Sequence, residues 1–335
     1  MSIQLEYEPK RRLRNGHLMT IYAWGRPRAF PGLPPPSDRL FDVAPATQVL
    51  AHCHWQTDRR HSPVLLALHG LEGSSSAHYM RGLALKAWRA GFSVIRLNQR
   101  NCGGTENLAD GLYHSGLTDD PNHVIEEIVR EDGVGKIVVA GYSLGGNLAL
   151  KLAGDHGADA PSQLLGVCAV SPVLELDACV HALERRQNIV YHWNFVRGLK
   201  ARMRRKVRCH PGRFSLEPLA RIRTVRDFDE LYTAPHFGFR DAADYYHRAS
   251  AMRVIDRIAV PALIITAEND PFVPSGPFRD PRVTGNPHIQ LIVTRHGGHC
   301  GFLTEAVNGD DGYWAESRIV NFARELAETA EATDF

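Results

Sequence analysis

The chain has 335 residues, of which 44% are hydrophobic and 23% charged, and its formal net charge is +2. These values are typical of a globular protein, and they exclude binding of nucleic acid through overall charge. The sequence has no apolar run of about 18 residues that would span a membrane, and its N-terminus has no apolar signal segment. Its six cysteines show no CxxC spacing, so we expect free thiols and a cytoplasmic protein.

The first 38 residues contain many Pro, Gly and Arg residues and show little hydrophobic period. We expect an N-terminal arm (residues 1–38) that packs on the rest of the chain through four apolar side chains. These are Leu18, Ile21, Tyr22 and Trp24. Residues 39–56 follow and predict a pair of antiparallel strands.

From residue 63 onward, short apolar runs alternate with helical patterns. Residues 63–70 (PVLLALHG) and 92–100 (FSVIRLNQR) predict buried strands, with a helix between them that ends at Gly91. A second helix is expected over residues 120–132, with Asp120 as its N-cap. Two more strands follow, then an interruption, then two strands and a final helix. This alternation predicts an α/β fold with a mostly parallel central sheet flanked by helices.

The interruption spans residues 175–250, which contain helix-like segments and no clear strand. We predict a helical cap there, inserted into a core formed by residues 39–174 and 251–335. The stretch 185–226 within the cap holds thirteen Lys and Arg residues and one acidic residue. The simplest interpretation is a solvated helix face. The alternative is transient contact with anionic lipid headgroups or with an acidic substrate such as an acyl-CoA.

The stretch GYSLGG, residues 141–146, follows a strand pattern and precedes a helical pattern. Ser143 is therefore expected on a strand-to-helix turn, with Gly141 and Gly145 two residues to either side. This is the G-x-S-x-G pattern of a nucleophile elbow, in which side chains at the flanking positions would clash. The serine oxygen would lie at a helix N-terminus, where developing negative charge is favoured. An ordinary Gly-rich turn is the alternative interpretation.

A serine nucleophile needs a base within hydrogen-bonding distance and an acid that orients the base. Parallel strands end at one edge of the sheet, where ligands bind, and the loops at these ends are rich in Gly and ionisable residues. We predict His299, in a Gly-flanked loop after the last strand, as the base, and Asp270, after the preceding strand, as the acid. The order Ser, Asp, His is that of α/β-hydrolases. The competing residues are His296, Glu268, Asp280 and Asp310.

An oxyanion formed at Ser143 needs two backbone N–H donors. We predict the N–H of Leu144, the residue after the nucleophile, and the N–H of Leu71, in the Gly-containing loop after the strand that ends at Leu68. The other residues expected near the pocket are His69, Arg100 and Tyr142. This chemistry needs no metal and no organic cofactor.

Seven motifs occur in order along nearly the whole chain. They are NGHLMTI (15–21), HGLEGSS (69–75), RLNQRNCGGTENL (96–108), YHSGLTDD (113–120), GYSLGGNLALKLAG (141–154), AENDPFVP (267–274) and GGHCGF (297–302). As a set they resemble the YheT-like branch of the α/β-hydrolase superfamily. That branch is similar to plant embryogenesis-associated proteins, yeast medium-chain ethyl ester synthase/esterases and animal monoacylglycerol lipase-like proteins.

The resemblance implies an α/β-hydrolase fold with Ser143 as nucleophile, Asp270 as acid and His299 as base. Where the family usually has NHRGC, this chain has NQRNC, so it departs from the pattern at Gln99 and Asn101.

We therefore expect a serine hydrolase that cleaves small-molecule carboxylic esters through an acyl-enzyme. The resemblance implies short- to medium-chain acyl esters, with monoacylglycerols among the candidates. Two alternatives stay open. The same triad could transfer an acyl group to an alcohol or act on an acyl-CoA thioester, or the chain could be a non-catalytic binding module on the same scaffold.

Overall fold

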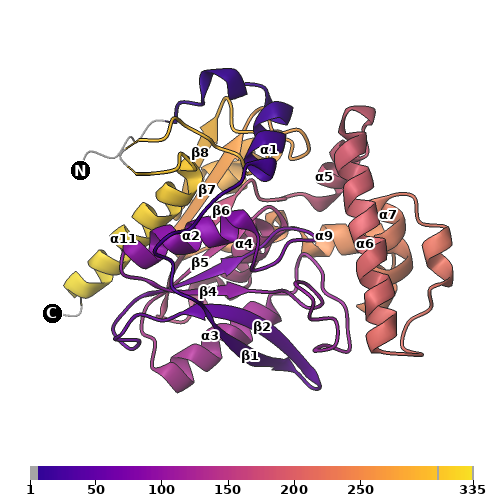
Figure 1. Ribbon diagram of the computed structural model, residues 1–335, viewed down its shortest axis with the longest axis horizontal. Coiled ribbons are helices and arrows are strands. Elements are labelled where there is room, and N and C mark those ends of the chain that lie inside the picture. Colours follow the sequence, from indigo (N-terminus) through magenta and orange to yellow (C-terminus); the bar gives the residue numbers. More distant parts are fainter. Residues whose placement is uncertain (1–6, 308, 334–335) are drawn as a thin grey trace.

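The computed structural model describes residues 7–307 and 309–333, and its centre is an eight-stranded sheet (Figure 1). The strand order is β1-β2-β4-β3-β5-β6-β7-β8. β1 and β2 form an antiparallel pair at one edge, and the other six strands run parallel to one another. The bounds are β1 Ser37–Ala44, β2 Thr47–His54, β3 Val64–Leu68, β4 Ser93–Leu97, β5 Ile137–Tyr142, β6 Leu164–Val170, β7 Ala262–Ala267 and β8 Ile289–Thr294.

The central strands are buried on both faces, which explains their unbroken apolar runs. Along β3, Leu65 and Ala67 belong to one hydrophobic core, whereas Leu66 and Leu68 belong to the other. Successive side chains of a strand point to opposite faces, so one apolar run fills two cores. The predicted mostly parallel α/β sheet is confirmed.

Helices cover both faces of the sheet. α2 (His78–Arg89) and α11 (Trp314–Thr333) pack on the face that holds Leu65, and α3 (Asp119–Asp132) and α4 (Leu144–His156) pack on the other. The short α10 (Pro281–Thr284) lies between β7 and β8 in the chain. The sheet therefore forms the middle layer of three, as the alternation of strands and helices indicated.

The start of α3 differs from the prediction. The N-cap is Thr118, and Asp120 lies inside the first turn, where it is buried. Its carboxylate accepts hydrogen bonds from the Arg100 Nε at 2.7 Å and the Arg100 Nη2 at 2.5 Å. The N-cap assignment was wrong because this carboxylate is bound by a guanidinium from the loop after β4 instead of capping backbone N–H groups.

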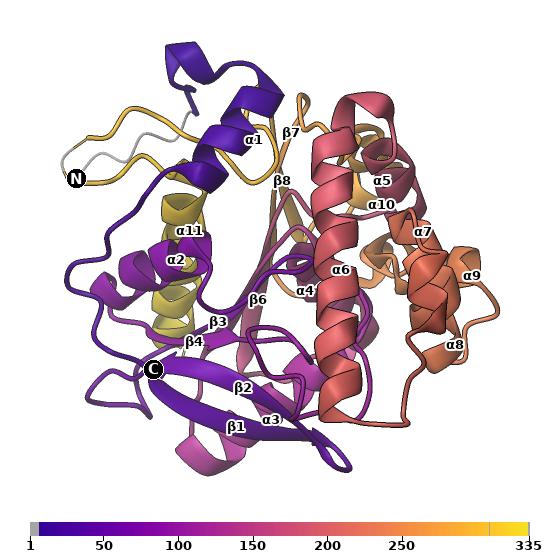
Figure 2. The same ribbon diagram turned by 45° about the vertical axis from the view of Figure 1, so that its right-hand side comes forward.

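The helices between β6 and β7 gather on one side of the sheet (Figures 1 and 2). They are α5 (Leu176–Leu183), α6 (Ile189–Cys209), α7 (Val225–Phe228), α8 (Ala234–His236) and α9 (Ala242–Ala249). They occupy the span for which the sequence indicated helices and no strand. Its treatment as a separate cap, residues 175–250, stays a prediction.

The N-terminal segment contains a helix, α1 (Gly16–Gly25), where the sequence indicated an irregular arm. Its buried face is formed by Gly16, Met19, Thr20 and Ala23. The four apolar residues expected to pack inward are instead exposed: Leu18 by 56%, Ile21 by 53%, Tyr22 by 43% and Trp24 by 72%. The prediction was wrong because the helical period of 3.6 residues turns these positions away from the buried face.

Candidate active site

Ser143 lies where β5 ends and α4 begins. Its backbone φ of 54° and ψ of −115° place it in a region that residues other than glycine rarely adopt. Its N–H donates to the Val170 carbonyl at 2.8 Å, and its own carbonyl accepts from the Asn147 N–H at 3.0 Å. Hydrogen bonds of both the N–H and the carbonyl of Ser143 therefore hold the turn in place. The Ser143 side chain stays partly exposed while the residues on either side are buried.

The two flanking glycines are required by contacts with backbone atoms. A Cβ on Gly141 would overlap the Gly145 carbonyl, and a Cβ on Gly145 would overlap the carbonyls of Leu68 and His69. Backbone atoms at the start of α4 and at the end of β3 cannot move aside as a flexible side chain can. These contacts are the physical reason for glycine at both positions.

Asp270 and His299 are brought together by the loops after β7 and β8. The His299 Nδ1 lies 2.8 Å from the Asp270 Oδ2. The other carboxylate oxygen, Oδ1, accepts the N–H groups of Phe272 at 3.0 Å and Val273 at 2.9 Å. Because every bond to the carboxylate comes from a donor, Asp270 is held as an acceptor that fixes the ring of His299.

The loop that carries His299 rests on α1, a support that the sequence reasoning missed. The His299 N–H donates to the Thr20 Oγ1 at 2.8 Å. The Gly298 N–H, at a φ of 58°, donates to the Asn269 Oδ1 at 3.0 Å. A Cβ on Gly298 would overlap the Gly16 carbonyl, so α1 and the loop that carries His299 touch without an intervening side chain. Gly16 and Thr20 belong to the motif NGHLMTI, which the sequence analysis singled out, but the sequence did not indicate what this motif contacts.

The charge state of His299 is set by two opposing effects. Burial lowers the pKa of its imidazole, but the Asp270 carboxylate, followed by the Cys300 side chain, favours the imidazolium. The net effect raises the pKa of His299 above its ordinary value. The arrangement therefore makes this imidazole a stronger base than a free histidine side chain.

Ser143 and His299 lie on loops that meet at the end of β6. The Val170 carbonyl accepts the Ser143 N–H and also lies 3.7 Å from the Cys300 Sγ, and the Cys300 N–H donates to the Ser171 Oγ at 3.2 Å. In the described structure no hydrogen bond joins the side chains of Ser143 and His299. Catalytic hydrogen bonds are often long before substrate binds, so this geometry is compatible with a nucleophile and its base.

The loop after β3 lies directly against Ser143. A Cβ on Gly70 would stand 3.3 Å from the Ser143 Cβ and 3.8 Å from its Oγ. A Cβ on Gly73 would lie 3.0 Å from the Gly70 carbonyl, so glycine also allows the loop to turn back on itself. Glu72 follows Leu71 in this loop and has a positive φ of 56°. The backbone of this loop therefore approaches the nucleophile so closely that a Cβ on Gly70 would make an unusually tight contact with Ser143.

The amides of this loop differ in what they bind. The Gly70 N–H donates to the Tyr79 hydroxyl at 3.1 Å, and the Glu72 N–H donates to the Tyr113 hydroxyl at 3.4 Å. In the part of the chain that the structure describes, the Leu71 N–H has no acceptor, and neither does the N–H of Leu144 at the start of α4. Two neighbouring backbone donors thus remain available beside Ser143.

His69 is buried and positions the same loop. Its Nε2 accepts the Gln99 N–H at 3.1 Å, and its Nδ1 lies 2.8 Å from the Gly70 carbonyl. Burial lowers the pKa of His69 to about 4, so the ring is neutral at pH 7 with its proton on Nδ1. The Gln99 side chain also donates to the His69 carbonyl at 2.7 Å. Gln99, which stands where the family pattern has another residue, thus connects the loops after β3 and β4 by hydrogen bonds.

The second departure, Asn101, is explained by its backbone. Its φ is 64°, in the left-handed region that favours glycine and tolerates asparagine. Its Nδ2 donates to the Gly111 carbonyl at 2.9 Å. Of the other residues expected near the pocket, Arg100 is bound to Asp120, and the Tyr142 ring packs 4.8 Å from the Tyr79 ring. Their role in binding a substrate stays a prediction.

The basic stretch of α6 is not a uniformly solvated face. Arg202 is buried, and its Nη2 lies 3.0 Å from the Glu72 Oε1 in the loop beside Ser143. Its guanidinium also stacks 4.5 Å from the centre of the Tyr113 ring. Lys206 is fully buried and donates to the carbonyls of Glu106 and Ala109. The interpretation of this basic stretch as a solvated helix face was therefore wrong at Arg202 and Lys206, because these two cations bind acceptors of the core.

Aromatic rings lie next to His299. The Phe272 ring centre is 4.1 Å from that of His299 and 5.3 Å from that of Tyr191, which comes from α6. Phe195, one turn further along α6, lies 6.4 Å from Phe272. The side of His299 that faces α6 is therefore apolar.

The competing residues are occupied elsewhere. Glu268 lies 3.1 Å from Arg279, Asp280 lies 2.9 Å from Arg282, and Asp310 lies 3.0 Å from Lys86. The His296 Nδ1 lies 2.9 Å from the Arg14 carbonyl. None of these pairs includes Ser143.

A cavity of about 740 Å³ lies elsewhere, between the loop before α3 and α9. Its described lining includes His114, Lys151, Phe237 and Arg248 and none of Ser143, Asp270 and His299. Among the residues that the structure describes, no three His, Cys, Asp or Glu side chains could hold a metal ion. No helix in the described ranges is both long enough and apolar enough to cross a membrane.

Comparison with known families gives one match over most of the chain. Residues 63–306 match the model of the alpha/beta hydrolase fold. YheT of Escherichia coli (strain K12) is 37% identical over 262 residues, which cover 78% of this chain and 76% of that protein. The medium-chain fatty acid ethyl ester synthase/esterase 2 of Saccharomyces cerevisiae is 28% identical over 287 residues, which cover 78% of this chain and 61% of that protein. The chain thus spans less than two thirds of the yeast relative.

Solved structures share the architecture. The esterase Pf2001 of Pyrococcus furiosus superposes with a TM-score of 0.58 at 15% sequence identity, over 90% of this chain and 98% of that chain. At this identity the likeness concerns the fold alone. It agrees with the eight-stranded sheet and its flanking helices.

Proposed function

The chain belongs to the α/β-hydrolase family, and on that premise we propose that it is a serine hydrolase that cleaves carboxylic esters. One observation carries the proposal: a strained serine at a helix N-terminus lies beside two unoccupied backbone N–H donors, and a carboxylate-bound histidine stands on the adjoining loop. Nucleophile, oxyanion donors and base are the three parts that acyl transfer needs.

In the proposed first step, the imidazole of His299 removes the hydroxyl proton of Ser143 as the serine oxygen attacks the acyl carbonyl. Asp270 keeps the His299 Nδ1 protonated and therefore leaves Nε2 free to accept that proton. The carboxylate also stabilises the imidazolium that forms, in agreement with the raised pKa of His299. His299 then gives the proton to the leaving alcohol.

The negative charge that develops on the carbonyl oxygen is bound by the N–H groups of Leu71 and Leu144. These donors need no rearrangement, because they have no acceptor in the described structure. Water, activated by the same histidine, then attacks the acyl-enzyme and releases the acid. None of these steps uses a metal or an organic cofactor.

We propose acyl esters of short to medium chain length as the substrates. The rings of Phe272, Tyr191 and Phe195 give the approach to His299 an apolar wall, which suits an acyl chain. The name of the yeast relative describes a synthase and esterase of medium-chain fatty acid ethyl esters, which supports the same class.

The same residues could instead pass the acyl group from an acyl-CoA to an alcohol. The basic α6 was the feature that favoured an acyl-CoA, but two of its cations, Arg202 and Lys206, bind the core. Analysis of the products formed in the presence of ethanol and acyl-CoA separates hydrolysis from transfer. A non-catalytic module would form neither product.

The proposal is tested by labelling with a fluorophosphonate and by hydrolysis of p-nitrophenyl esters of graded chain length. Wild-type protein should be labelled and should hydrolyse the esters, and Ser143→Ala should lose both, with kcat reduced by about 10⁴-fold or more. Ser76→Ala, which changes an exposed serine in the loop before α2, is the matched control. Retained hydrolysis in Ser143→Ala would contradict the assignment, whereas unlabelled wild-type protein would favour a binding module.

A further inference from the structure

Exposed large apolar side chains are concentrated in two segments of the described chain. Of the eleven such side chains, seven lie in α1 and in the first turns of α6. We call these seven the apolar face. They are Leu18, Ile21, Tyr22, Trp24, Ile189, Val190 and Trp193, with exposed fractions between 43% and 72%. Isolated exposed apolar residues are common, but a cluster of this kind marks a surface that meets another molecule.

The two segments adjoin although more than 160 residues separate them in the sequence. The ring of His17 in α1 stacks on the ring of Tyr191 in α6 with centres 5.8 Å apart, and the Tyr191 hydroxyl donates to the His17 carbonyl at 3.4 Å. Ile21 and Trp24 follow His17 by four and seven residues, so they lie on the same side of α1. Figures 1 and 2 show α1 and the start of α6 at the same end of the molecule.

The apolar face also adjoins the candidate active site. Thr20, on the buried face of α1, accepts the His299 N–H, and Tyr191 contacts Phe272 beside the His299 ring. The helices that expose these side chains are therefore the same helices that flank the proposed catalytic histidine. A molecule bound to the apolar face would lie next to the approach to Ser143.

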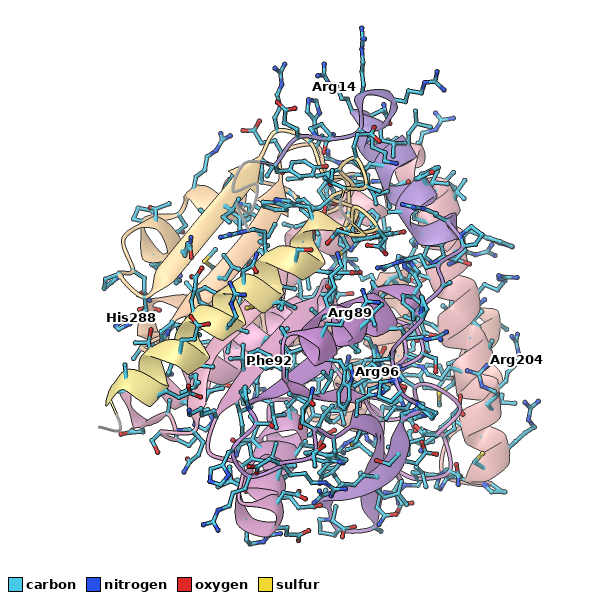
Figure 3. All side chains as sticks on the ribbon, turned by 60° about the vertical axis from the view of Figure 1, so that its left-hand side comes forward. Arg14, Arg89, Phe92, Arg96, Arg204 and His288 are labelled. Atoms are coloured by element: carbon cyan, nitrogen blue, oxygen red, sulfur yellow. The ribbon has the colours of Figure 1, made fainter. Side chains whose placement is uncertain are left out.

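Both segments are basic and contain no acidic residue. Residues 10–26 hold five Lys or Arg and no Asp or Glu, and residues 185–197, which include the first turns of α6, hold three and none. Several of these cations are exposed, and Figure 3 shows Arg14 before α1 pointing away from the molecule. The Arg197 guanidinium stacks 5.0 Å from the Trp193 ring. The apolar face is thus bordered by positive charge.

A small hollow completes this surface. It has a volume of about 340 Å³ and is lined by Ile189, Val190, His192, Trp193, Val196 and Arg223. Its walls are mostly apolar, and an exposed guanidinium stands at the side. An apolar chain attached to an anionic headgroup has this combination of chemistry, because a guanidinium binds phosphate oxygens in a bidentate manner.

We propose that the apolar face is a docking surface for a bilayer that contains anionic phospholipid. Exposed tryptophans and aliphatic side chains enter the headgroup region, and the surrounding Arg and Lys residues attract anionic lipids. Docking would turn the side of the molecule that carries the partly exposed Ser143 and His299 toward the lipid, so that esters dissolved in the bilayer reach Ser143 without crossing water. This last step rests on the proposed esterase activity, whereas docking does not.

The experiment measures co-sedimentation of the full chain with vesicles of phosphatidylcholine alone or mixed with phosphatidylglycerol. We expect binding to the mixed vesicles and weak binding to phosphatidylcholine. Ile21→Ser/Trp24→Ser/Trp193→Ser should reduce binding at least about tenfold. Leu40→Ser/Leu216→Ser/Val293→Ser, which removes three exposed apolar side chains elsewhere, should bind like wild type. Circular dichroism and hydrolysis of a water-soluble ester show that both variants are folded.

Two further measurements separate the outcomes. Ser143→Ala should bind vesicles like wild type, so that loss of esterase activity and loss of docking are distinguishable. Light scattering without lipid reports whether the apolar face joins two copies of the chain. Equal binding by wild type and the Ile21/Trp24/Trp193 variant overturns the proposal. A dimer that this variant dissociates, with no vesicle binding by wild type, also overturns it and assigns the face to self-association.

Discussion

The two halves of α6 face different surroundings, although both belong to one continuous helix, Ile189–Cys209. In its C-terminal half, Arg202 and Lys206 are buried against loops of the core. In its N-terminal half, Val190 and Trp193 are exposed. At these four positions the usual distribution of charged and apolar residues is reversed, since the two buried side chains are cations and the two exposed ones are apolar. Under the docking proposal, the C-terminal half serves the fold and the exposed side chains of the N-terminal half meet the lipid.

After Ser143→Ala, the largest expected effect on kcat comes from Asp270, a residue outside α6. Asp270→Asn should lower kcat by about 10³- to 10⁴-fold, because the amide no longer holds the His299 ring in the required tautomer or stabilises the imidazolium. The activity should also decrease as the pH is lowered. The base must be neutral, so activity is lost as the pH falls through the pKa of His299, which Asp270 raises.

Without that carboxylate, the acidic limb of kcat against pH should move to lower pH. The profiles of wild type and Asp270→Asn, measured with a p-nitrophenyl ester, test this shift. An unchanged acidic limb would show that another group titrates there.

The next effect concerns the buried half of α6. Arg202→Ala leaves the Glu72 carboxylate, whose side chain is only 15% exposed, without its cation and should lower the free energy of unfolding by about 3–5 kcal/mol. Because Glu72 follows Leu71, the loop that offers the oxyanion donor should loosen, and kcat should fall by about 10- to 100-fold. Urea unfolding and ester hydrolysis measure the two effects.

Two controls sharpen this comparison. Arg204→Ala removes an exposed cation two residues away, and Trp193→Ala removes an exposed ring in the other half. Each should change the free energy of unfolding by less than about 0.5–1 kcal/mol. If Trp193→Ala destabilised the protein as much as Arg202→Ala does, the two halves would not differ in the way proposed.

A smaller effect is expected from Lys206 and depends on pH. Burial lowers the pKa of Lys206 to about 8, below the value of 10.5 for a free lysine. Between these values the unfolded chain binds the proton and the folded chain does not, so the stability of wild type should rise as the pH increases through this window. Lys206→Met should lack this rise. Thermal unfolding of both proteins from pH 7 to about 10.5 tests it, and parallel curves would contradict a buried, titrating Lys206.

The sequence pattern located structural features correctly wherever the local geometry requires one type of residue. Glycines at 141 and 145 avoid overlap with backbone carbonyls, so the turn around Ser143 could be located from the sequence. The alternation of apolar runs with helical patterns predicted the parallel sheet because strands buried on both faces need no polar alternation. The pairing of Asp270 with His299 followed from loops at the same edge of that sheet.

Tertiary contacts decided what local pattern left open. The sequence places Leu18, Ile21, Tyr22 and Trp24 close together, and apolar character alone suggested burial. The structure exposes all four, because the buried face of α1 is occupied by Met19, Thr20 and Ala23. Likewise, nothing next to Thr20 in the chain indicates that its hydroxyl holds the His299 N–H, since 279 residues separate the two.

By itself, the sequence determined the fold class and the chemistry proposed at Ser143, because both depend on short motifs whose geometry is local. The tertiary structure alone decided which charges of α6 are buried and which apolar side chains meet the surroundings. The physical reason is that burial depends on what packs against a residue, and in α1 and α6 the packing partners come from distant parts of the chain.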